Sequence, residues 1–495
     1  MSKHESIRHV ASLTALGAAL TAALLLGGCM SFVPTYERPA APVPVAYPPG
    51  FLPQGSDASV TAAADIEWQR FFADARLVRL IDIALQNNRD LRVAVLNIEQ
   101  ARAAYQIRRA DELPTLGAGV SAQRQPGATG KLANIYAAGF QVTGYELDLF
   151  GRVRSLSQSA LSQYLATEEA RKTVQITLVS LVANTYVSLL ADDEVLRVTR
   201  EALKTREDSF RLTKLKFDAG ASSELDFRQA EQLLEGARVT LAQTLRQRAL
   251  DENALVFLLG QALPTDLPPS VPLAAQQGVA DLPAGLPSDL MTRRPDVRAA
   301  EQQLLAANAN IGAARAAFFP RIALTANAGI ASTALSGLFT SGIFALTGTA
   351  NLLQPIFDAG RNQAGLDVAK VNREIAVAQY EKAIQIAFRE VSDSLAGRAT
   401  LGEQLRAQAA QTNAAQITYK LADLRYRAGA SSYLEVLDAQ RTLFAAQQAT
   451  VQVQALQVQN QVTLYKVLGG GWTEPELRSA VLAAPAAPAV PAPAN

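Results

Sequence analysis

The chain has 495 residues, and its 46 lysines and arginines nearly balance its 45 aspartates and glutamates. With no excess charge of either sign, the composition does not favour a nucleic-acid partner. The histidines, His4 and His9, and the single cysteine, Cys29, all lie within the first 29 residues. The rest of the chain therefore lacks the side chains that most often act as general base, metal ligand or thiolate nucleophile.

The first residues have the pattern of a lipoprotein signal peptide. Lys3 and Arg8 supply the positive start, and residues 11–26 form an uncharged apolar stretch. The sequence Leu-Gly-Gly-Cys at 26–29 has the small residues of a cleavage site, so we expect residues 1–28 to be removed and Cys29 to carry lipid. Several acyl chains, at about 0.8 kcal/mol per buried methylene, would anchor the chain firmly. A buried or redox-active cysteine is the alternative, and it leaves the preceding apolar run unexplained.

Beyond the signal, the most apolar stretch runs from 174 to 191 without a charge and is long enough to span a membrane. It contains polar residues such as Gln175, Ser180 and Asn184, and it lies inside a much longer helical pattern. We therefore expect a helix packed against protein. Any crossing of a membrane by the mature chain must then use strands.

The chain contains two copies of one unit. Residues 217–226, FDAGASSELD, return as residues 426–435, YRAGASSYLE, 209 positions later. Pro114 and Pro320 form a similar pair, 206 positions apart. Nearly constant separations over such a length indicate an internal duplication.

Each copy is predicted to begin with a helix, at 75–111 and 296–317, and then to form a β-hairpin. After Pro114 and Pro320 the period of the apolar residues changes from about 3.6 to 2, which is typical of strands. Strands of about 10 to 12 residues match the length that crosses a bilayer at a tilt, with one apolar and one small polar face. A soluble hairpin packed on a core is the alternative. Four strands cannot close a barrel in lipid, but three chains would supply twelve.

The hairpins are followed by helical patterns at 152–217 and 361–426, which contain no proline. Each would be about 100 Å long. They end at Gly220 and Gly429, where a glycine is typical of a helix stop. A returning helix of about 55 Å is too short to flank the long one, so we expect it to stack end to end with the opening helix of its copy.

The predicted organisation follows from these segments. It consists of a signal peptide at 1–28, a lipid-anchored extended segment at 29–64, repeat 1 at 65–262 with its hairpin at 114–149, a proline-rich linker at 263–287, repeat 2 at 288–470 with its hairpin at 320–354, and an Ala/Pro-rich tail at 471–495.

Several longer motifs resemble those of one family. They are PTYERP at 34–39, AANANIGAARAAFFP at 306–320 and PIFDAGR at 355–361. With them the chain resembles the outer-membrane factor family of TolC-like and OprM-like channels, in the lipoprotein branch of RND-type efflux subunits. The resemblance covers about residues 29–470. It implies a mainly α chain with a small β part and two structural repeats, which trimerises into a 12-stranded β-barrel and a 12-helix periplasmic α-barrel.

The same resemblance implies the function. The chain would be the outer-membrane channel of a tripartite efflux pump, a passive exit duct for drugs or other small molecules. Its partners would be two further copies, a periplasmic adaptor, an inner-membrane transporter and outer-membrane lipid, with no nucleic acid, cofactor, metal or catalytic residue. The alternatives are the duct of a type I secretion system, a non-channel periplasmic coiled-coil lipoprotein and, more remotely, a carboxylate-dependent hydrolase.

The resemblance also assigns residues near the two glycine turns. The constriction would hold Leu434, Asp438 and Arg441, a tip network Asp226, Tyr426 and Glu435, and the adaptor would dock at Ala219, Gly220, Ala221, Ala428, Gly429 and Ala430. Ser431 departs from the family, because some relatives have a latching arginine there. From the residues alone, Asp438 and Arg441 share a helix face, and three converging carboxylates would repel one another and favour cations. The alternative is that Asp438 and Arg441 form a surface ion pair worth well under about 1 kcal/mol.

Overall fold

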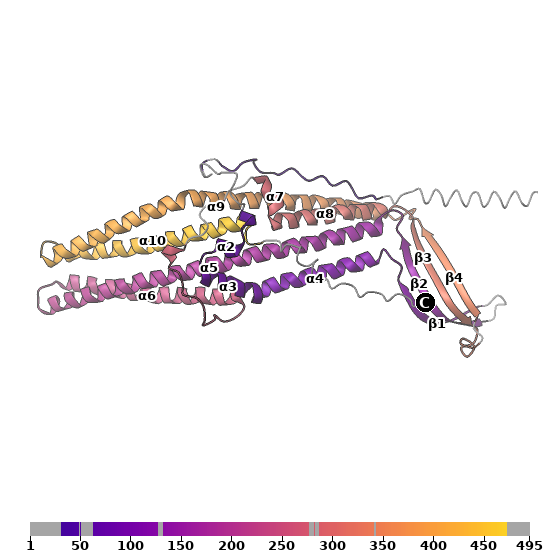
Figure 1. Cartoon of the computed structure of the whole chain (residues 1–495), viewed down its shortest axis with the longest axis horizontal. Helices are drawn as coiled ribbons and strands as arrows, with labels where there is room; N and C mark the ends of the chain where they lie inside the picture. The colour runs from indigo at the N-terminus through magenta and orange to yellow at the C-terminus, as the bar shows by residue number, and fades with distance from the viewer. Residues whose placement is uncertain are drawn as a thin grey trace, which may run out of the picture. The chain divides into compact units, whose positions relative to one another are not determined.

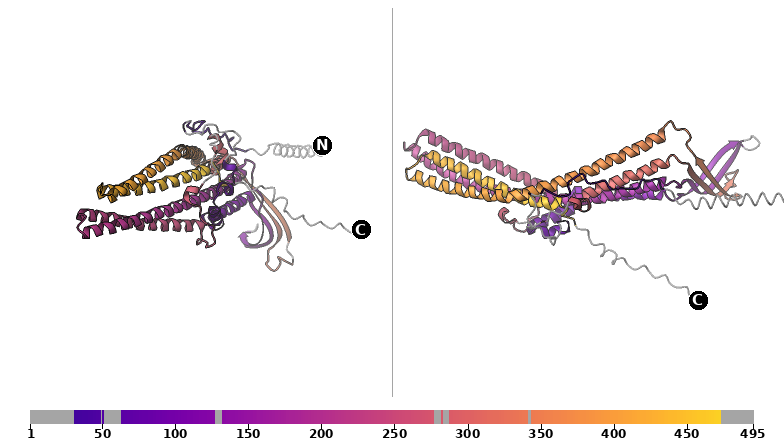
Figure 2. Two further views of the ribbon diagram at one scale, coloured as in Figure 1. Left: turned by 60° about the vertical axis from the view of Figure 1, so that its left-hand side comes forward. Right: turned by 90° about the horizontal axis from the view of Figure 1, so that it is seen from above.

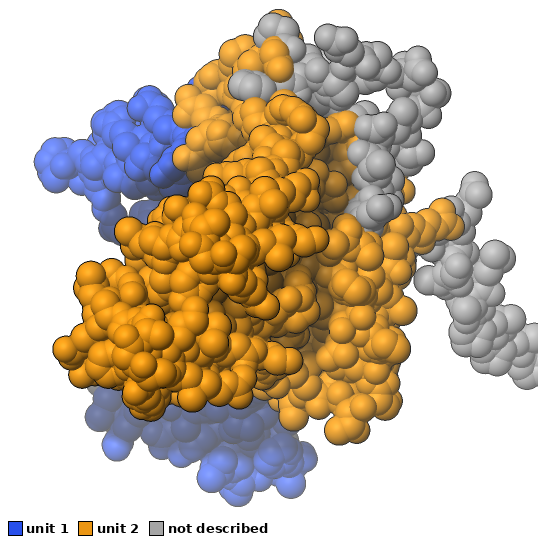
Figure 3. All heavy atoms as spheres, turned by 90° about the vertical axis from the view of Figure 1, so that its left-hand side faces the viewer, with its two compact units in different colours: residues 1–40, 96–169, 299–382 blue, residues 41–95, 170–298, 383–495 orange. Residues whose placement is uncertain are grey.

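The computed structural model describes residues 31–48, 50, 63–126, 132–276, 282, 287–340 and 343–472, so the predicted signal peptide, Cys29 and nearly all of the tail lie outside the described residues. The chain divides into two compact units, coloured in Figure 3. Unit 1 comprises residues 1–40, 96–169 and 299–382, and unit 2 comprises residues 41–95, 170–298 and 383–495. Each unit contains corresponding segments of repeat 1 and repeat 2, so both units reflect the internal duplication.

Unit 1 contains the predicted strands. Within the described ranges they form one four-stranded antiparallel sheet in the order β1-β2-β3-β4 (Figure 1). The strands are β1 Leu116–Pro126, β2 Leu132–Leu147, β3 Arg321–Ser332 and β4 Ile343–Leu353. The prediction of one hairpin per repeat is confirmed, and the two hairpins are joined by pairing between β2 and β3. Large apolar side chains on the sheet, such as Val120, Phe344 and Leu346, are exposed.

The two hairpins meet at a pair of glycines. Gly139 of β2 is the register partner of Gly329 of β3. A Cβ atom on Gly139 would lie 2.4 Å from the carbonyl oxygen of Ala328, and one on Gly329 would lie 2.2 Å from the carbonyl oxygen of Ala138. The backbones therefore approach too closely here for any side chain.

Unit 1 also holds the N-terminal segment against helix α8, Pro295–Ala316. Residues 31–40 contain no helix or strand. The buried carboxylate of Glu301 accepts hydrogen bonds from the Tyr36 hydroxyl at 2.9 Å and from Arg38 Nε at 2.7 Å. Burial and this carboxylate raise the pKa of Tyr36 above its ordinary range. Further along α8, Asn308 Nδ2 donates to the carbonyl of Pro34 at 2.8 Å, so the segment is fixed along the helix.

Unit 2 is helical, and two very long helices run into it from unit 1. These are α5, Arg152–Asp218, and α9, Arg361–Arg427, which confirm the predicted ranges to within one residue. Figures 1 and 2 show α6, Glu224–Leu259, beside α5, and α10, Tyr433–Val467, beside α9. The remaining elements are η2 Ala63–Asp65, α2 Trp68–Phe71, α3 Ala75–Asn87, η3 Leu273–Ala275, η4 Pro287–Asp289 and α7 Leu290–Arg293.

The predicted helix at 75–111 is two helices, α3 and α4, with α4 spanning Arg89–Ala110. Asn88 lies between them, and its Oδ1 accepts from the backbone N–H of Leu91 at 3.0 Å. Its Nδ2 donates to the carbonyl of Leu258 at 2.9 Å, in the last turn of α6. The return helix therefore ends where α4 begins, which is the predicted end-to-end arrangement.

One helix of the described part, α5, contains a window long and apolar enough to cross a membrane, and 56% of that window is buried within the protein. Val182, Ala183 and Val187 of α5 are almost fully buried. The burial agrees with the prediction that residues 174–191 pack against protein.

Candidate functional site at the ends of the helical hairpins

The two helical hairpins, α5–α6 and α9–α10, end in the same turn. Gly220 has a φ of 69° and Gly429 a φ of 73°, left-handed values that favour glycine. The Ala221 N–H donates to the Lys216 carbonyl at 2.7 Å, and the Ala430 N–H donates to the Arg425 carbonyl at 2.9 Å. These are the bonds of a Schellman motif. A Cβ atom added to Gly220 or Gly429 would meet nothing within 4 Å, so both turns are open to an approaching partner.

Near the turns, the two hairpins share an apolar cluster. Its buried members are Ala230, Ala422, Tyr433, Val436, Leu437 and Ala439, with Phe210, Leu233, Tyr419 and Tyr426 packed against them. Burial raises the pKa of Tyr433, so its phenol stays neutral at physiological pH. The cluster holds the hairpins together with side chains from both repeats.

Two hydrogen bonds join α5 to the second hairpin. Lys216 Nζ donates to the Tyr426 hydroxyl at 3.1 Å and lies 4.3 Å from the centroid of that ring. Gln440 Nε2 donates to Ser209 Oγ at 3.3 Å. The residues from α5 fall on one helix face. They could not be predicted from the sequence, because their partners lie more than 200 positions away.

A third residue of this face, Arg206, is 6% exposed. Its guanidinium lies 4.9 Å from the centroid of Phe444, and its Nη1 donates to the carbonyl of Leu233 at 3.3 Å. Burial lowers its pKa, and the nearby charge of Arg441 lowers it further. Among the described residues no carboxylate forms an ion pair with it. A buried cation without a carboxylate partner is unfavourable, so the contacts between the two hairpins are not all stabilising.

The predicted constriction residues are exposed in the single chain. Leu434 is 55% exposed, and Asp438 and Arg441 also face solvent. Within the described part of the chain, no ion pair joins Asp438 to Arg441. Glu435 is 3.9 Å from Arg425, a distant contact between exposed groups.

Tyr426 and Asp226 of the predicted tip network have different partners in this structure. Tyr426 contacts Lys216, whereas Asp226 Oδ2 accepts from Ser223 Oγ at 2.8 Å and from Ser222 Oγ at 3.3 Å. Asp226 thus forms a capping box with Ser223 at the start of α6. Ser431 Oγ is buried, and none of the described residues hydrogen-bonds to it.

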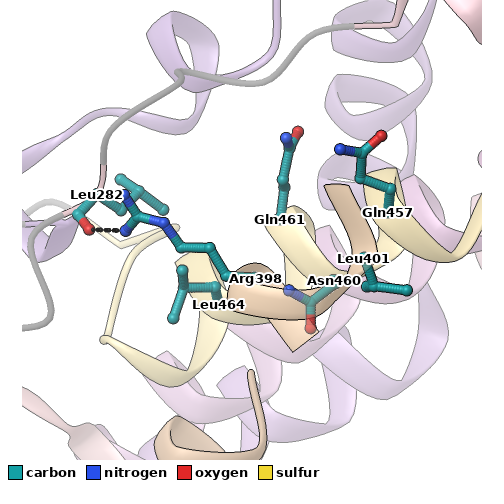
Figure 4. A pocket seen from close by; sticks show the side chains of 7 residues that line it. All are labelled: Leu282, Arg398, Leu401, Gln457, Asn460, Gln461 and Leu464. Carbon is teal, nitrogen blue, oxygen red and sulfur yellow. Dashed lines mark hydrogen bonds between the residues drawn. The ribbon is translucent and has the colours of Figure 1, made fainter. Parts of the chain in front are cut away.

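No group of three or more His, Cys, Asp or Glu side chains among the described residues could hold a metal ion. A small cavity of about 50 Å³ lies between α9 and α10. Figure 4 shows residues that line it, among them Gln457, Asn460 and Leu464. There Arg398 Nη1 donates to the carbonyl of Leu282 at 2.6 Å, so a residue of the proline-rich linker fills one side. The cavity is too small for a drug-sized ligand.

Two repeats, each a strand hairpin followed by a helical hairpin with a 67-residue helix, define a TolC-like outer-membrane channel subunit. The chain belongs to the outer membrane efflux protein family, which matches residues 80–261 and 286–470. The protein is accordingly an outer-membrane efflux protein.

Individual relatives are similar over almost their whole length. The solvent efflux pump outer membrane protein SrpC of Pseudomonas putida is 48% identical over 91% of this chain and 97% of its own. The outer membrane protein OprJ of Pseudomonas aeruginosa is 44% identical over 92% and 96%. Among solved structures, the open state of the Neisseria gonorrhoeae MtrE outer membrane channel has 40% identity and a TM-score of 0.80, covering 89% of this chain and 98% of that one.

Proposed function

We propose that three copies of this chain form a passive exit duct across the outer membrane, as the last component of a tripartite efflux pump. The observation that carries the proposal is the sheet of unit 1. Its strands have 11 to 16 residues, enough to cross a bilayer at a tilt, and large apolar side chains on β1, β2 and β4, such as Val120, Phe140 and Leu346, are exposed. The duct needs no catalytic group, and none is assigned.

The sheet requires partner strands. Among the described residues, nothing pairs with the outer edge of β1 or of β4. In lipid each unpaired backbone group costs several kcal/mol, so a four-stranded sheet cannot remain open there. Three copies pairing β4 of one with β1 of the next close a ring of twelve strands. A periplasmic coiled-coil lipoprotein would have no use for such strands.

The partners and cargo follow from the open turns and from the relatives. A periplasmic adaptor, itself bound to an inner-membrane transporter, docks at Ala219–Gly220–Ala221 and Ala428–Gly429–Ala430, where small side chains permit close approach. Relatives are named as solvent and antibiotic efflux pump proteins, so we propose small molecules as cargo here. Lipid on Cys29 anchors the chain beside its barrel.

The gate proposal predicts a change in conductance. Replacing Asp438 by alanine removes three converging carboxylates from the narrowest ring, so Asp438→Ala trimers should conduct more or lose preference for cations in planar bilayers. Glu403→Ala is the control, because Glu403 is an exposed acid of the same hairpin that pairs with Arg406. If Asp438→Ala and the parent give the same traces, Asp438 is not part of the constriction.

A further inference from the structure

Arg206 is a buried cation that forms no ion pair with any carboxylate of the described residues. It is 6% exposed, and its guanidinium lies 4.9 Å from the centroid of Phe444. Nη1 donates to the carbonyl of Leu233, which is a neutral partner. Arginine stays charged in proteins, and buried charges are ordinarily paired. The countercharge for Arg206 must therefore come from elsewhere.

Arg206 lines a cavity of about 90 Å³ between α5, α9 and α10. A single water molecule needs about 15 Å³ of such space, so the cavity has room for a small ion together with water. Most of its polar lining consists of side chains that can donate hydrogen bonds. These are Arg206, Gln416, Tyr419, Gln440 and Gln447.

The charges around the cavity are positive on balance. The carboxylate in its lining, Glu201, has a side chain that is 69% exposed and pairs with Arg197 at 3.2 Å. Arg441 of α10 lies close enough to Arg206 for its charge to lower the pKa of that guanidinium, beyond the larger effect of burial. Two arginine charges thus act on a space whose carboxylate is already paired. Such a space attracts an anion.

Gln440 can supply a further donor to the cavity. It is 6% exposed, its Nε2 donates to Ser209 Oγ, and its buried Oε1 has no hydrogen-bond partner among the described residues. A serine hydroxyl can donate as well as accept. A half-turn of the Gln440 amide would therefore keep the bond to Ser209 and place an N–H group where Oε1 now lies. An anion in the cavity can accept from that group.

We propose that the cavity binds a small monovalent anion, a halide or a short carboxylate, which pairs with Arg206. The guanidinium and the glutamine amides are donors of the kind that such anions accept from, and a hydrogen bond from a charged donor is about twice as strong as a neutral one. All of these groups lie in one chain, so the site goes beyond the proposed trimeric duct and does not depend on it.

The anion stabilises the packing of the two helical hairpins. Because α5 belongs to the first hairpin and α9 and α10 belong to the second, an ion between them neutralises a charge that otherwise disfavours their contact. A ligand that binds only the folded protein raises the free energy of unfolding as its concentration rises. The stability of this packing should therefore depend on the anions in the surrounding solution.

A chloride titration tests the proposal on the purified protein in detergent. Chloride replaces gluconate at constant ionic strength, because gluconate has the same charge but is too large for the cavity. The unfolding temperature of the parent should rise with chloride concentration, and that of Arg206→Met should not. Arg211→Met is the matched control, because Arg211 is an exposed arginine of the same helix that already pairs with Asp208. It should respond as the parent does.

General effects of chloride on stability act on the parent and on Arg206→Met alike, so the difference between them reports the site. An equal chloride response of the two proteins would contradict the proposal.

Bromide gives a direct measurement that does not require Arg206→Met to fold. In crystals of the parent protein soaked in bromide, anomalous scattering should show an ion in contact with the Arg206 guanidinium. Adding acetate then distinguishes the two kinds of anion, since loss of the bromide signal identifies a carboxylate site and its persistence a halide site. Water alone in the cavity of the soaked crystals would exclude the proposed anion.

Discussion

Replacing Gly329 by valine should almost eliminate assembled channel from the outer membrane. A Cβ at this position would lie 2.2 Å from the carbonyl oxygen of Ala138, a contact with backbone that no side-chain movement can relieve. The strands β2 and β3 must separate there, and this pairing is what joins the two repeats into one sheet. Each unpaired backbone group in lipid costs several kcal/mol. The loss of even a few hydrogen bonds between β2 and β3 therefore costs more free energy than the total stability of a typical domain.

The measurement is the amount of heat-modifiable oligomer in outer-membrane fractions, compared with total protein made. Gly348→Val is the matched control. Gly348 lies in β4 of the same sheet, and a Cβ added there would meet nothing within 4 Å. Gly348→Val should therefore assemble normally. Normal assembly of Gly329→Val would mean that β2 and β3 do not approach as closely as described.

The strands and long helices could be predicted from the sequence because their signals are local. The change of period after Pro114 and Pro320 marks the start of each hairpin, and two proline-free stretches mark α5 and α9. The break at Asn88 was not predicted, although the five polar residues 86–90 interrupt the apolar pattern there, because no proline or glycine marks it. Its side chain holds the break by bonding both to α4 and to the last turn of α6, a contact between distant segments.

The candidate site was predictable to different degrees. The turns at Gly220 and Gly429 follow from local sequence, and so does the capping box of Ser223 and Asp226. The role of Asp226 in a tip network came only from the family resemblance and stays a prediction. The contacts of Lys216 and Arg206 could not be read in advance, because nothing local distinguishes a helix face that meets another hairpin from one that meets water. The duplication allows a comparison, since Ser209 and Lys216 of α5 are partly buried, whereas Thr418 and Arg425, 209 positions later on α9, are exposed.

Pump function should be lost when Gly429 is replaced by tryptophan. The left-handed backbone there costs a non-glycine residue about 1 to 2 kcal/mol, which is small against the packing of helices as long as α9 and α10. The trimer should therefore still form. The indole would project into the open space beside the turn, where a Cβ meets nothing within 4 Å and where we propose that the adaptor docks.

The measurement is the resistance of cells to exported compounds. With trimer levels equal to those of the parent protein, cells with Gly429→Trp should be as sensitive as cells without the protein. Gly429→Asn is the control, since asparagine tolerates a left-handed backbone and adds little bulk. It should keep most of the resistance. Because both variants lose glycine, a difference between them reports the size of the side chain rather than the strain of the turn. Full resistance in Gly429→Trp would exclude docking at this turn, because a helix tip cannot approach a backbone covered by an indole ring.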